Sequence, residues 1–357
     1  MSNNVSIIGT VGVPAAYGGF ETLVENLLDY AASEALPLQL TVYCSGNAGI
    51  STYKGASLRY VNVGANGISS IVYDVISIFS SIWKNDSIII LLGVSGAIVL
   101  PLVRLISKVR IITNVDGVEW KRAKWGRLAK LFLRVSEFLA VKFSHQVIAD
   151  NRGIAEHVLA EYSVKCAVIG YGGDHAINVD PKEIPVELPN NFSLSLCRIE
   201  PENNVEMILT AFAAMENFNL VFIGNWKASS FGVSMFEKFS MVPNIHLLDP
   251  IYDLGVLRSI RSKAAFYVHG HSAGGTNPSL VEMMHFGIPV FAFDCIFNRY
   301  TTDDKAQFFS DADSLRSNLI ELDDDQLLLV GSSLKNVAIK KYTWKVIGKQ
   351  YFDLLCY

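Results

Sequence analysis

Residues 5–35 read VSIIGTVGVPAAYGGFETLVENLLDYAASEA, and this stretch decides the fold. Val5–Ile8 is a short apolar run that predicts a buried strand. Gly9–Gly19 is a glycine-rich turn, and Phe20–Ala35 has apolar residues at helical spacing. A strand, a turn and a helix in this order predict one unit of a parallel, doubly wound α/β sheet.

The same alternation recurs along the chain. It predicts strands at Leu38–Cys44, Ile88–Leu92, Arg110–Thr113, Gln146–Ala149, Phe192–Cys197, Leu220–Ile223, Ile245–Leu248, Ala265–Val268 and Val290–Ala292. The proline-rich stretch 181–191 (PKEIPVELPNN) is typical of an interdomain linker. We therefore expect Rossmann-like domains at 1–180 and 192–335. The tail 336–357 is expected to be helical, and whether it packs on the first domain is left open. The two domains would face a central cleft with the site between the carboxyl ends of both sheets.

The composition excludes a disordered chain. Half of the 357 residues are hydrophobic and 18% are charged, whereas disorder requires few apolar and many charged residues. The mean hydropathy of +0.30 raises the question of membrane contact. The uncharged run Ser87–Val103 contains two glycines and a proline and is at the lower length limit for a spanning helix. It is therefore interpreted as a buried strand, a turn and an apolar helix.

The charge is unevenly distributed. The formal net charge is −4, yet residues 101–145 hold ten Lys or Arg and three Asp or Glu. Basic and apolar residues interleave at helical spacing in Lys121–Lys142, with Trp120 and Trp125 as candidate interface anchors. This pattern fits an anionic membrane surface, and an ordinary amphipathic surface helix is the alternative. Nucleic acid is disfavoured because no recognition module is apparent.

The cysteine and aspartate patterns argue against a metal site. The five cysteines are far apart and form no C-x-x-C pair, which disfavours a zinc or redox motif. The number of cysteines is odd, and the N-terminal residues predict a strand rather than a signal peptide. Both observations indicate a cytoplasmic protein. Two Asp-x-Asp pairs, Asp311/Asp313 and Asp323/Asp325, lie in polar surface stretches. We expect neither a metal nor another cofactor.

The loop G9-TVGVPAAYGGF-E21 is the first candidate binding motif. Glycines allow close approach of a ligand, and free amides at the start of a helix favour an anion. The pattern is not G-x-G-x-x-G, and the next strand ends at Tyr43–Ser45 without an acidic residue. NAD binding is therefore disfavoured. A tight structural connection is the alternative.

G270-HSA-G274 formally matches a hydrolase nucleophile elbow around Ser272. The only later histidine is His285, and the only acid between them is Glu282. These two residues are three positions apart on one predicted helix and cannot form the relay. A serine hydrolase is therefore disfavoured.

Three further motifs follow predicted strands. G274-GTNPSLV-E282 places glycines and amide donors before a helix, which suits a phosphate, and a carboxylate inside it, which suits a ribose diol. Arg198 follows a strand, where its fork matches two phosphate oxygens. Asp116 and Glu119 follow another strand and could bind sugar hydroxyls or act as a base. Each motif also has a structural alternative. The first could be only an N-capped helix, Arg198 only a member of a surface ion pair, and Asp116 only a helix-capping residue.

Together these motifs resemble the retaining GT-B glycosyltransferases of family four, and more narrowly a bacterial rhamnosyltransferase-like subgroup of O-antigen and capsule synthesis. Six collinear blocks carry the resemblance: GTVGVPAAYGGFETLVENL, NVDGVEWKRAKWG, IADNRGIAEHV, CRIEPENNVEMIL, HGHSAGGTNPSLVEMM and YTWKVIGKQY.

The resemblance implies roles for individual residues. Arg198 would contact the donor diphosphate, and Glu282 the nucleotide ribose. Asp116 would lie near the transferring sugar, with Arg198 and Glu282 as its partners in catalysis. The other donor-binding positions would be Gly18, Gly19, Asn203, Asp249, Tyr252, Gly274, Gly275, Thr276 and Asn277. The acceptor and membrane side would include Glu119, Trp120, Lys121, Arg122, Lys124, Trp125 and Arg127.

Two positions depart from the general family pattern. The earlier of its paired glutamates is Gly274 here, and Asn203 stands where the family has a lysine after the arginine. One phosphate charge is thereby lost. Arg198, backbone amides and helix N-termini would have to neutralise the diphosphate.

The resemblance implies transfer of a sugar, L-rhamnose from dTDP-L-rhamnose being favoured, to a polyprenyl-diphosphate-linked saccharide at the inner face of the plasma membrane. Alternatives are a UDP- or GDP-sugar donor, a GT-B-type sugar epimerase, the serine hydrolase through Ser272 and a non-enzymatic nucleotide-sugar sensor.

Overall fold

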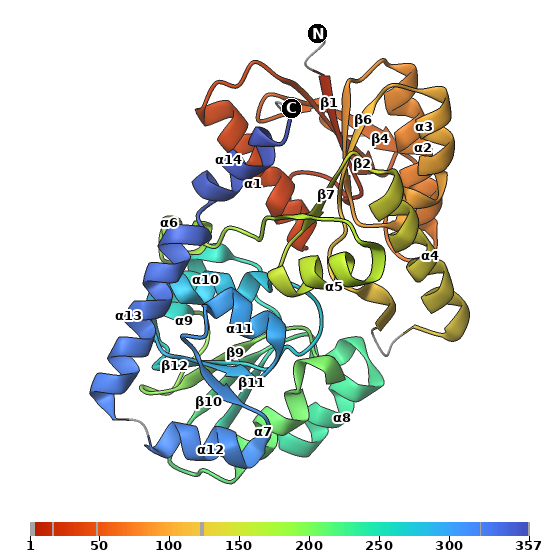
Figure 1. Cartoon of the computed structure of the whole chain (residues 1–357). Helices are drawn as coiled ribbons and strands as arrows, with labels where there is room; N and C mark the ends of the chain where they lie inside the picture. The colour runs from red at the N-terminus through yellow and green to blue at the C-terminus, as the bar shows by residue number, and fades with distance from the viewer. Residues whose placement is uncertain (1–3, 16–17, 48, 122–124, 322, 356–357) are drawn as a thin grey trace. The chain divides into compact units, whose positions relative to one another are not determined.

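The computed structural model describes the chain except residues 1–3, 16–17, 48, 122–124, 322 and 356–357. It divides into two compact units (Figure 1). The first unit comprises residues 1–170 and 344–357, and the second comprises residues 171–343. The sequence placed the first boundary at residue 180. Residues 171–180 belong with the second unit because α6 (His175–Asn178) packs there against α9 and α10.

The first unit contains an eight-stranded sheet in the order β3-β4-β2-β1-β5-β6-β7-β8. All pairings are parallel except β3 with β4. The strands are β1 (Asn4–Ile8), β2 (Gln39–Ser45), β3 (Thr52–Tyr53), β4 (Ala56–Val61), β5 (Ile88–Leu92), β6 (Arg110–Asn114), β7 (Gln146–Ala149) and β8 (Ala167–Val168). Its helices are α1 (Gly19–Ser33), α2 (Ser69–Trp83), α3 (Leu100–Ile106), α4 (Arg127–Phe143), α5 (Arg152–Tyr162) and α14 (Trp344–Asp353), with short 3-10 helices η1 (Ser95–Val99) and η2 (Glu119–Lys121).

The second unit contains a six-stranded parallel sheet in the order β11-β10-β9-β12-β13-β14. The strands are β9 (Ser193–Leu196), β10 (Leu220–Ile223), β11 (Ile245–Leu248), β12 (Phe266–His269), β13 (Val290–Phe293) and β14 (Gln307–Phe309). The helices besides α6 are α7 (Val205–Ala213), α8 (Ser230–Phe239), α9 (Leu254–Lys263), α10 (Pro278–Phe286), α11 (Ile296–Thr302), α12 (Ala312–Glu321) and α13 (Asp324–Lys341), with 3-10 helices η3 (Pro201–Asn203) and η4 (Trp226–Ala228).

Both sheets have the doubly wound order 3-2-1-4-5-6, if β3 and β8 are set aside as additions to the first. In such sheets ligands bind outside the carboxyl ends of the strands where the order reverses. The reversal lies between β1 and β5 in the first unit and between β9 and β12 in the second. The predicted pair of Rossmann-like α/β domains is therefore confirmed, and each has one defined switch point.

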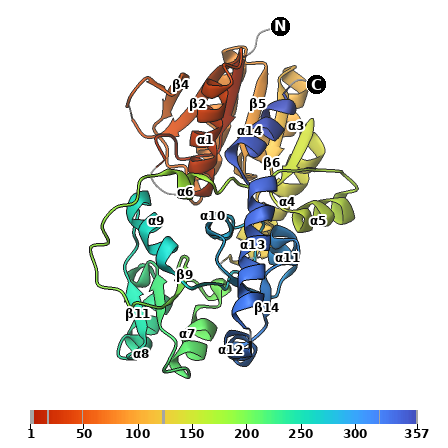
Figure 2. The ribbon, with the colours of Figure 1, turned by 90° about the vertical axis from the view of Figure 1, so that its left-hand side faces the viewer.

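The tail differs from the single helix expected over 336–357. It forms α13 in the second unit and α14 in the first, with Tyr342 and Thr343 between them. Helix α14 lies beside α1 (Figures 1 and 2), where Tyr30 and Phe352 stack with ring centroids 5.8 Å apart. A side chain at Gly348 would overlap the Tyr30 ring. The two helices therefore pack closely only because position 348 is glycine.

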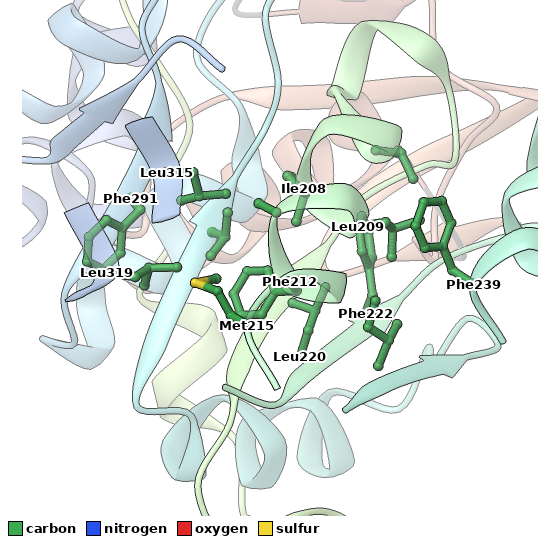
Figure 3. Packing of buried hydrophobic residues seen from close by; sticks show 14 of the residues in the cluster. Ile208, Leu209, Phe212, Met215, Leu220, Phe222, Phe239, Phe291, Leu315 and Leu319 are labelled. Carbon is green, nitrogen blue, oxygen red and sulfur yellow. The ribbon is translucent and has the colours of Figure 1, made fainter. Parts of the chain in front are cut away.

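The uncharged run Ser87–Val103 forms β5, η1 and the start of α3, as expected. Among the described residues, no helix is long and apolar enough to span a membrane. The hydrophobic core of the second unit lies between its sheet and α7, α8 and α12, with Phe212 near its centre and Phe291 at one end (Figure 3).

Asp74 on α2 is a buried carboxylate in the first unit. It is 2% exposed and accepts a hydrogen bond from the backbone of Gly96, while its Oδ1 has no partner among the described residues. Burial raises the pKa of Asp74 to about 7. Because the folded-state pKa lies above the unfolded one, the protonated form favours folding. This contribution is complete below about pH 4 and is lost as the pH rises through 7.

Replacing Asp74 with asparagine should therefore stabilise the first unit at pH 8, by on the order of 2 kcal/mol. Urea denaturation at pH 5 and pH 8 measures this. The gain should be smaller at pH 5, where the wild-type carboxyl is mostly protonated. An equal effect at both pH values would contradict the expectation.

Candidate functional site

In the second unit, the candidate residues gather at the carboxyl ends of β9 and β12, on either side of the switch point. The loop after β9 is Cys197–Asn204, and the loop after β12 is Gly270–Asn277. Several hydrogen bonds join these loops directly, three of them through Ser272 and Asn204. The Ser272 amide and hydroxyl both donate to the Glu202 carbonyl, at 3.0 and 2.7 Å, and the Asn204 amide donates to the Gly270 carbonyl at 2.8 Å. The two loops are therefore joined into one surface at the carboxyl edge of the sheet.

Arg198 extends from this surface into solvent. Its side chain is 42% exposed, and its guanidinium lies 3.7 Å from the Glu200 carboxylate. An exposed ion pair at this distance contributes little stability, since it is weak and screened. The guanidinium is therefore available for an anionic ligand.

Asn203 is not placed to contact a donor. It is 4% exposed, and its amide nitrogen donates to the Arg198 carbonyl at 2.7 Å. Its amide oxygen lies 2.6 Å from Nδ1 of His271. The Asn203 side chain thus links the backbone of Arg198 to His271 and fixes the loop Cys197–Asn204. This corrects the expectation of direct donor contact: Asn203 does not substitute for the family lysine.

Glu282 lies on α10 and is held by two cationic or protonatable side chains. The Arg261 guanidinium donates to its Oε2, and His175 Nε2 lies 3.2 Å from its Oε1. Burial alone would raise the pKa of Glu282, but Arg261 and His175 lower it to about 2. The carboxylate is therefore ionised at every physiological pH. Neither partner was expected from the sequence, because both are distant from Glu282 along the chain and only the structure shows that they lie beside it.

The loop before α10 combines glycine conformations with a helix cap. Gly274 has φ +108°, a region that side-chain-bearing residues rarely adopt. Gly275 is half-buried, Thr276 is buried, and the Asn277 side chain accepts from the Ser279 amide. Asn277 is thus an N-cap, and it stands where a ligand would meet the start of the helix.

Asp249 and Tyr252 follow β11 and are exposed. Asp249 makes a long contact with Lys227, at 3.5 Å, and Tyr252 is 62% exposed. They lie on the same carboxyl edge as Arg198 but follow the edge strand of the sheet.

The hydrolase alternative is contradicted by the hydrogen bonds of its residues. Ser272 donates to a carbonyl, Glu282 is bound by Arg261, and His285 is buried with its Nε2 3.0 Å from the Tyr342 carbonyl. None of the three contacts another in the order a catalytic triad needs.

In the first unit, the glycine-rich loop follows β1 and is held by carboxylates of α1. Glu21 accepts from the Thr10 hydroxyl and the Val11 amide, and Glu25 accepts from the Ala15 amide. Gly18 has φ +133°, and a side chain there would overlap the Glu21 carboxylate. Gly19 begins α1. The glycines are therefore required for closure of the loop itself, and their expected contact with a diphosphate stays a prediction.

Asp116 follows β6 in a left-handed conformation with φ +58°. Its amide donates to Asn114 Oδ1 at 2.9 Å, and the Asn114 amide donates to the Tyr351 hydroxyl at 2.7 Å. Tyr351 belongs to α14, so the C-terminal helix supports the Asp116 turn. Backbone strain of this kind concentrates at functional sites.

The acceptor-side residues differ in exposure. Trp120 is half-buried, and its indole donates to Glu137 at 3.1 Å, so its role as an interface anchor stays a prediction. Glu119 and Trp125 are half-buried as well. Lys121 and Arg127 are exposed, and Arg122 and Lys124 lie outside the described residues.

Neither Asp-x-Asp pair resembles a metal site. Asp311 accepts from the Ser314 amide, Asp313 pairs with Arg316, and Asp323 caps α13 with Gln326. Within the part of the chain that the structure describes, no group of three or more His, Cys, Asp or Glu could hold a metal ion.

Two doubly wound domains of this order define the GT-B fold, and solved structures agree across the whole chain. Sucrose-phosphate synthase from Thermosynechococcus elongatus matches with a TM-score of 0.79 at 15% identity, covering 99% of this chain and 98% of that one. HepE from Anabaena, solved with UDP, matches at 0.73 and 12% identity, covering 99% of both chains. A putative UDP-N-acetylglucosamine 2-epimerase from Listeria monocytogenes matches at 0.66 and 12%, covering 99% and 96%.

Sequence comparisons add less. A family model described as a domain of unknown function, DUF1972, matches residues 2–174. No curated protein matches the chain. At these identities the structural matches establish the fold alone.

Proposed function

We propose that the chain is a glycosyltransferase that moves a sugar from a nucleotide diphosphate to an acceptor hydroxyl. The observation that carries this proposal is the joined surface at the second switch point, where an exposed Arg198 lies in the loop after β9 and an ionised Glu282 lies on α10, the helix that follows the loop after β12. An exposed guanidinium suits a diphosphate, and a carboxylate suits ribose hydroxyls. That HepE was solved with UDP and glucose on the same fold supports a nucleotide-sugar donor.

The chemistry asked of the chain is stabilisation of a leaving diphosphate. Arg198 would neutralise charge as it develops on the departing phosphate, assisted by amides of the Gly274–Asn277 loop. Glu282 would hold the ribose, and Asp116 would position the sugar or acceptor. Following the resemblance, we propose that the reaction retains anomeric configuration as in family four. The finer proposal is L-rhamnose from dTDP-L-rhamnose, transferred without a metal to a polyprenyl-diphosphate-linked saccharide in surface polysaccharide synthesis.

The donor is tested by a thermal-shift panel of dTDP, UDP and GDP and their sugar conjugates. A ligand bound only by the folded state raises the melting temperature. We expect the largest rise with dTDP-L-rhamnose, and a larger rise with UDP or GDP conjugates would overturn the choice of base. Interconversion of donor sugars without acceptor would favour an epimerase, a class whose fold this chain shares.

An apolar stripe on α4 supports work at a membrane surface, on the inner face of the plasma membrane. Leu128, Leu131, Val135 and Phe138 recur at helical spacing, and they are 84%, 61%, 41% and 42% exposed. The neighbouring α3 exposes Leu105 as well, at 84%. Exposed basic residues on α4 include Arg127 and Arg134. Such a face suits an interface with anionic lipid.

Replacing both Leu128 and Leu131 with serine should weaken binding to vesicles of anionic phospholipid by about tenfold, because each leucine contributes apolar area. Cosedimentation at low salt measures this. The matched control replaces Leu328 and Leu329, which are 70% and 67% exposed on α13 of the second unit, and should bind like the wild type. Wild-type protein that stays in the supernatant would overturn the membrane proposal.

A further inference from the structure

Glu282, Arg261 and His175 form a largely buried cluster of charged and protonatable side chains from three helices. Arg261 comes from the last turn of α9 and its side chain is 2% exposed, whereas Glu282 on α10 is 13% exposed. His175 on α6 is 15% exposed. Each carboxylate oxygen therefore has one partner inside the unit, and each keeps a further lone pair for another donor.

The chain approaches α10 closely to place His175. A Cβ atom at Gly173 would lie 2.7 Å from the Val281 carbonyl and 2.8 Å from the Glu282 nitrogen. The Gly173 amide donates to the Tyr342 carbonyl at 2.8 Å. Only glycine fits between these backbones, so the segment before α6 is fixed relative to Glu282.

The cluster is poorly explained as a stability device. Nε and Nη1 of Arg261 have no hydrogen-bond partner among the described residues. Buried N–H groups without acceptors are costly, and buried ion pairs can often be replaced by apolar side chains without loss of stability. The buried Arg261 guanidinium is therefore better explained by its effect on the orientation of the Glu282 carboxylate than by its contribution to stability.

We propose that Arg261 and His175 are positioning residues that turn the Glu282 carboxylate toward the free hydroxyls of the nucleotide's pentose, both of them in a ribonucleotide and the 3′-hydroxyl alone in dTDP. This inference rests on the proposed function. The pair approaches the carboxylate from inside the unit, through α9 and α6, and the partly exposed oxygens keep their remaining lone pairs for the ligand. Loss of the pair should therefore impair recognition of the ribose hydroxyls and leave binding of the diphosphate and base unchanged.

The test compares two ligands that differ only in those hydroxyls. Calorimetry would measure UDP against 2′,3′-dideoxy-UDP, GDP against 2′,3′-dideoxy-GDP, and dTDP against 3′-deoxy-dTDP, with wild type and Arg261→Met. We expect the wild type to prefer the hydroxylated member of the pair it binds by about tenfold or more, as for a hydrogen bond to a charged group. In Arg261→Met this preference should fall below about threefold, with little change in affinity for the deoxy analogue.

Controls separate positioning from folding. Arg258→Met, on the same helix but bonded to the Val179 carbonyl, should keep the wild-type preference, and Arg261→Lys should restore part of it. If Arg261→Met does not fold, His175→Leu, at a less buried position, provides the same comparison. An equal loss of affinity for the hydroxylated and the deoxy nucleotide, or an unchanged preference between them, would overturn this inference but not the proposed function. If the wild type binds none of the six nucleotides, the proposed function fails as well.

Discussion

Replacing Arg198 with alanine is expected to lower sugar-transfer turnover by about 10²- to 10³-fold. The expectation follows from the cost of removing one preorganised donor that faces charge developing in a transition state. Arg198 is 42% exposed and its ion pair with Glu200 is long, so alanine should leave the fold intact. The measurement is transfer from the donor that the thermal-shift panel selects, with unfolding monitored in parallel.

Two variants complete the Arg198 experiment. Arg198→Lys keeps the charge but loses the bidentate fork, and it should lie between wild type and alanine. Lys238→Ala removes another exposed cation of the same unit, one paired with Glu206, and should have no effect. Turnover of Arg198→Ala within about threefold of wild type would show that the diphosphate is neutralised elsewhere.

Much of the sheet could be predicted because buried parallel strands are uninterrupted apolar runs. The predicted bounds of β5, β7, β10 and β11 are the observed ones. The strands that were missed are β3, β4, β8 and β14. Three of these have two or three residues, too few to show a period, and β4 (ASLRYV) mixes polar and apolar positions. Local sequence therefore identified the centre of each sheet better than its margins.

The candidate site was predictable to the level of its loops. Arg198 and Glu282 stand at the end of a strand and inside a helix, and both positions follow from the alternating pattern. Asn203 was misjudged because sequence does not show which way an amide turns. Arg261 was missed because a cation in the last turn of a helix is ordinarily explained by the helix dipole. Its burial against a carboxylate 21 positions away is a tertiary fact.

The largest expected effect on stability is at Phe212, and it concerns the second unit alone. Phe212 on α7 is fully buried and lies among Met215, Leu220 and Phe222 in the core (Figure 3). Replacing it with alanine should lower the free energy of unfolding of this unit by about 3–5 kcal/mol, because both burial and packing are lost. Phe212→Leu should cost less, since most of the volume is kept.

The two units need not unfold together, so the probe must report on the second one. Trp226 is the one tryptophan in residues 171–343, and it packs edge-on against Phe222, with ring centroids 5.3 Å apart, inside the same core. Urea titration of 5-fluorotryptophan-labelled protein, followed by ¹⁹F NMR, would resolve its signal. The urea concentration at the midpoint of the Trp226 transition should fall in Phe212→Ala. It should be unchanged in Leu328→Ala, a substitution at a surface position. An unchanged urea midpoint for Trp226 in Phe212→Ala would mean that this cluster does not stabilise the sheet of the second unit.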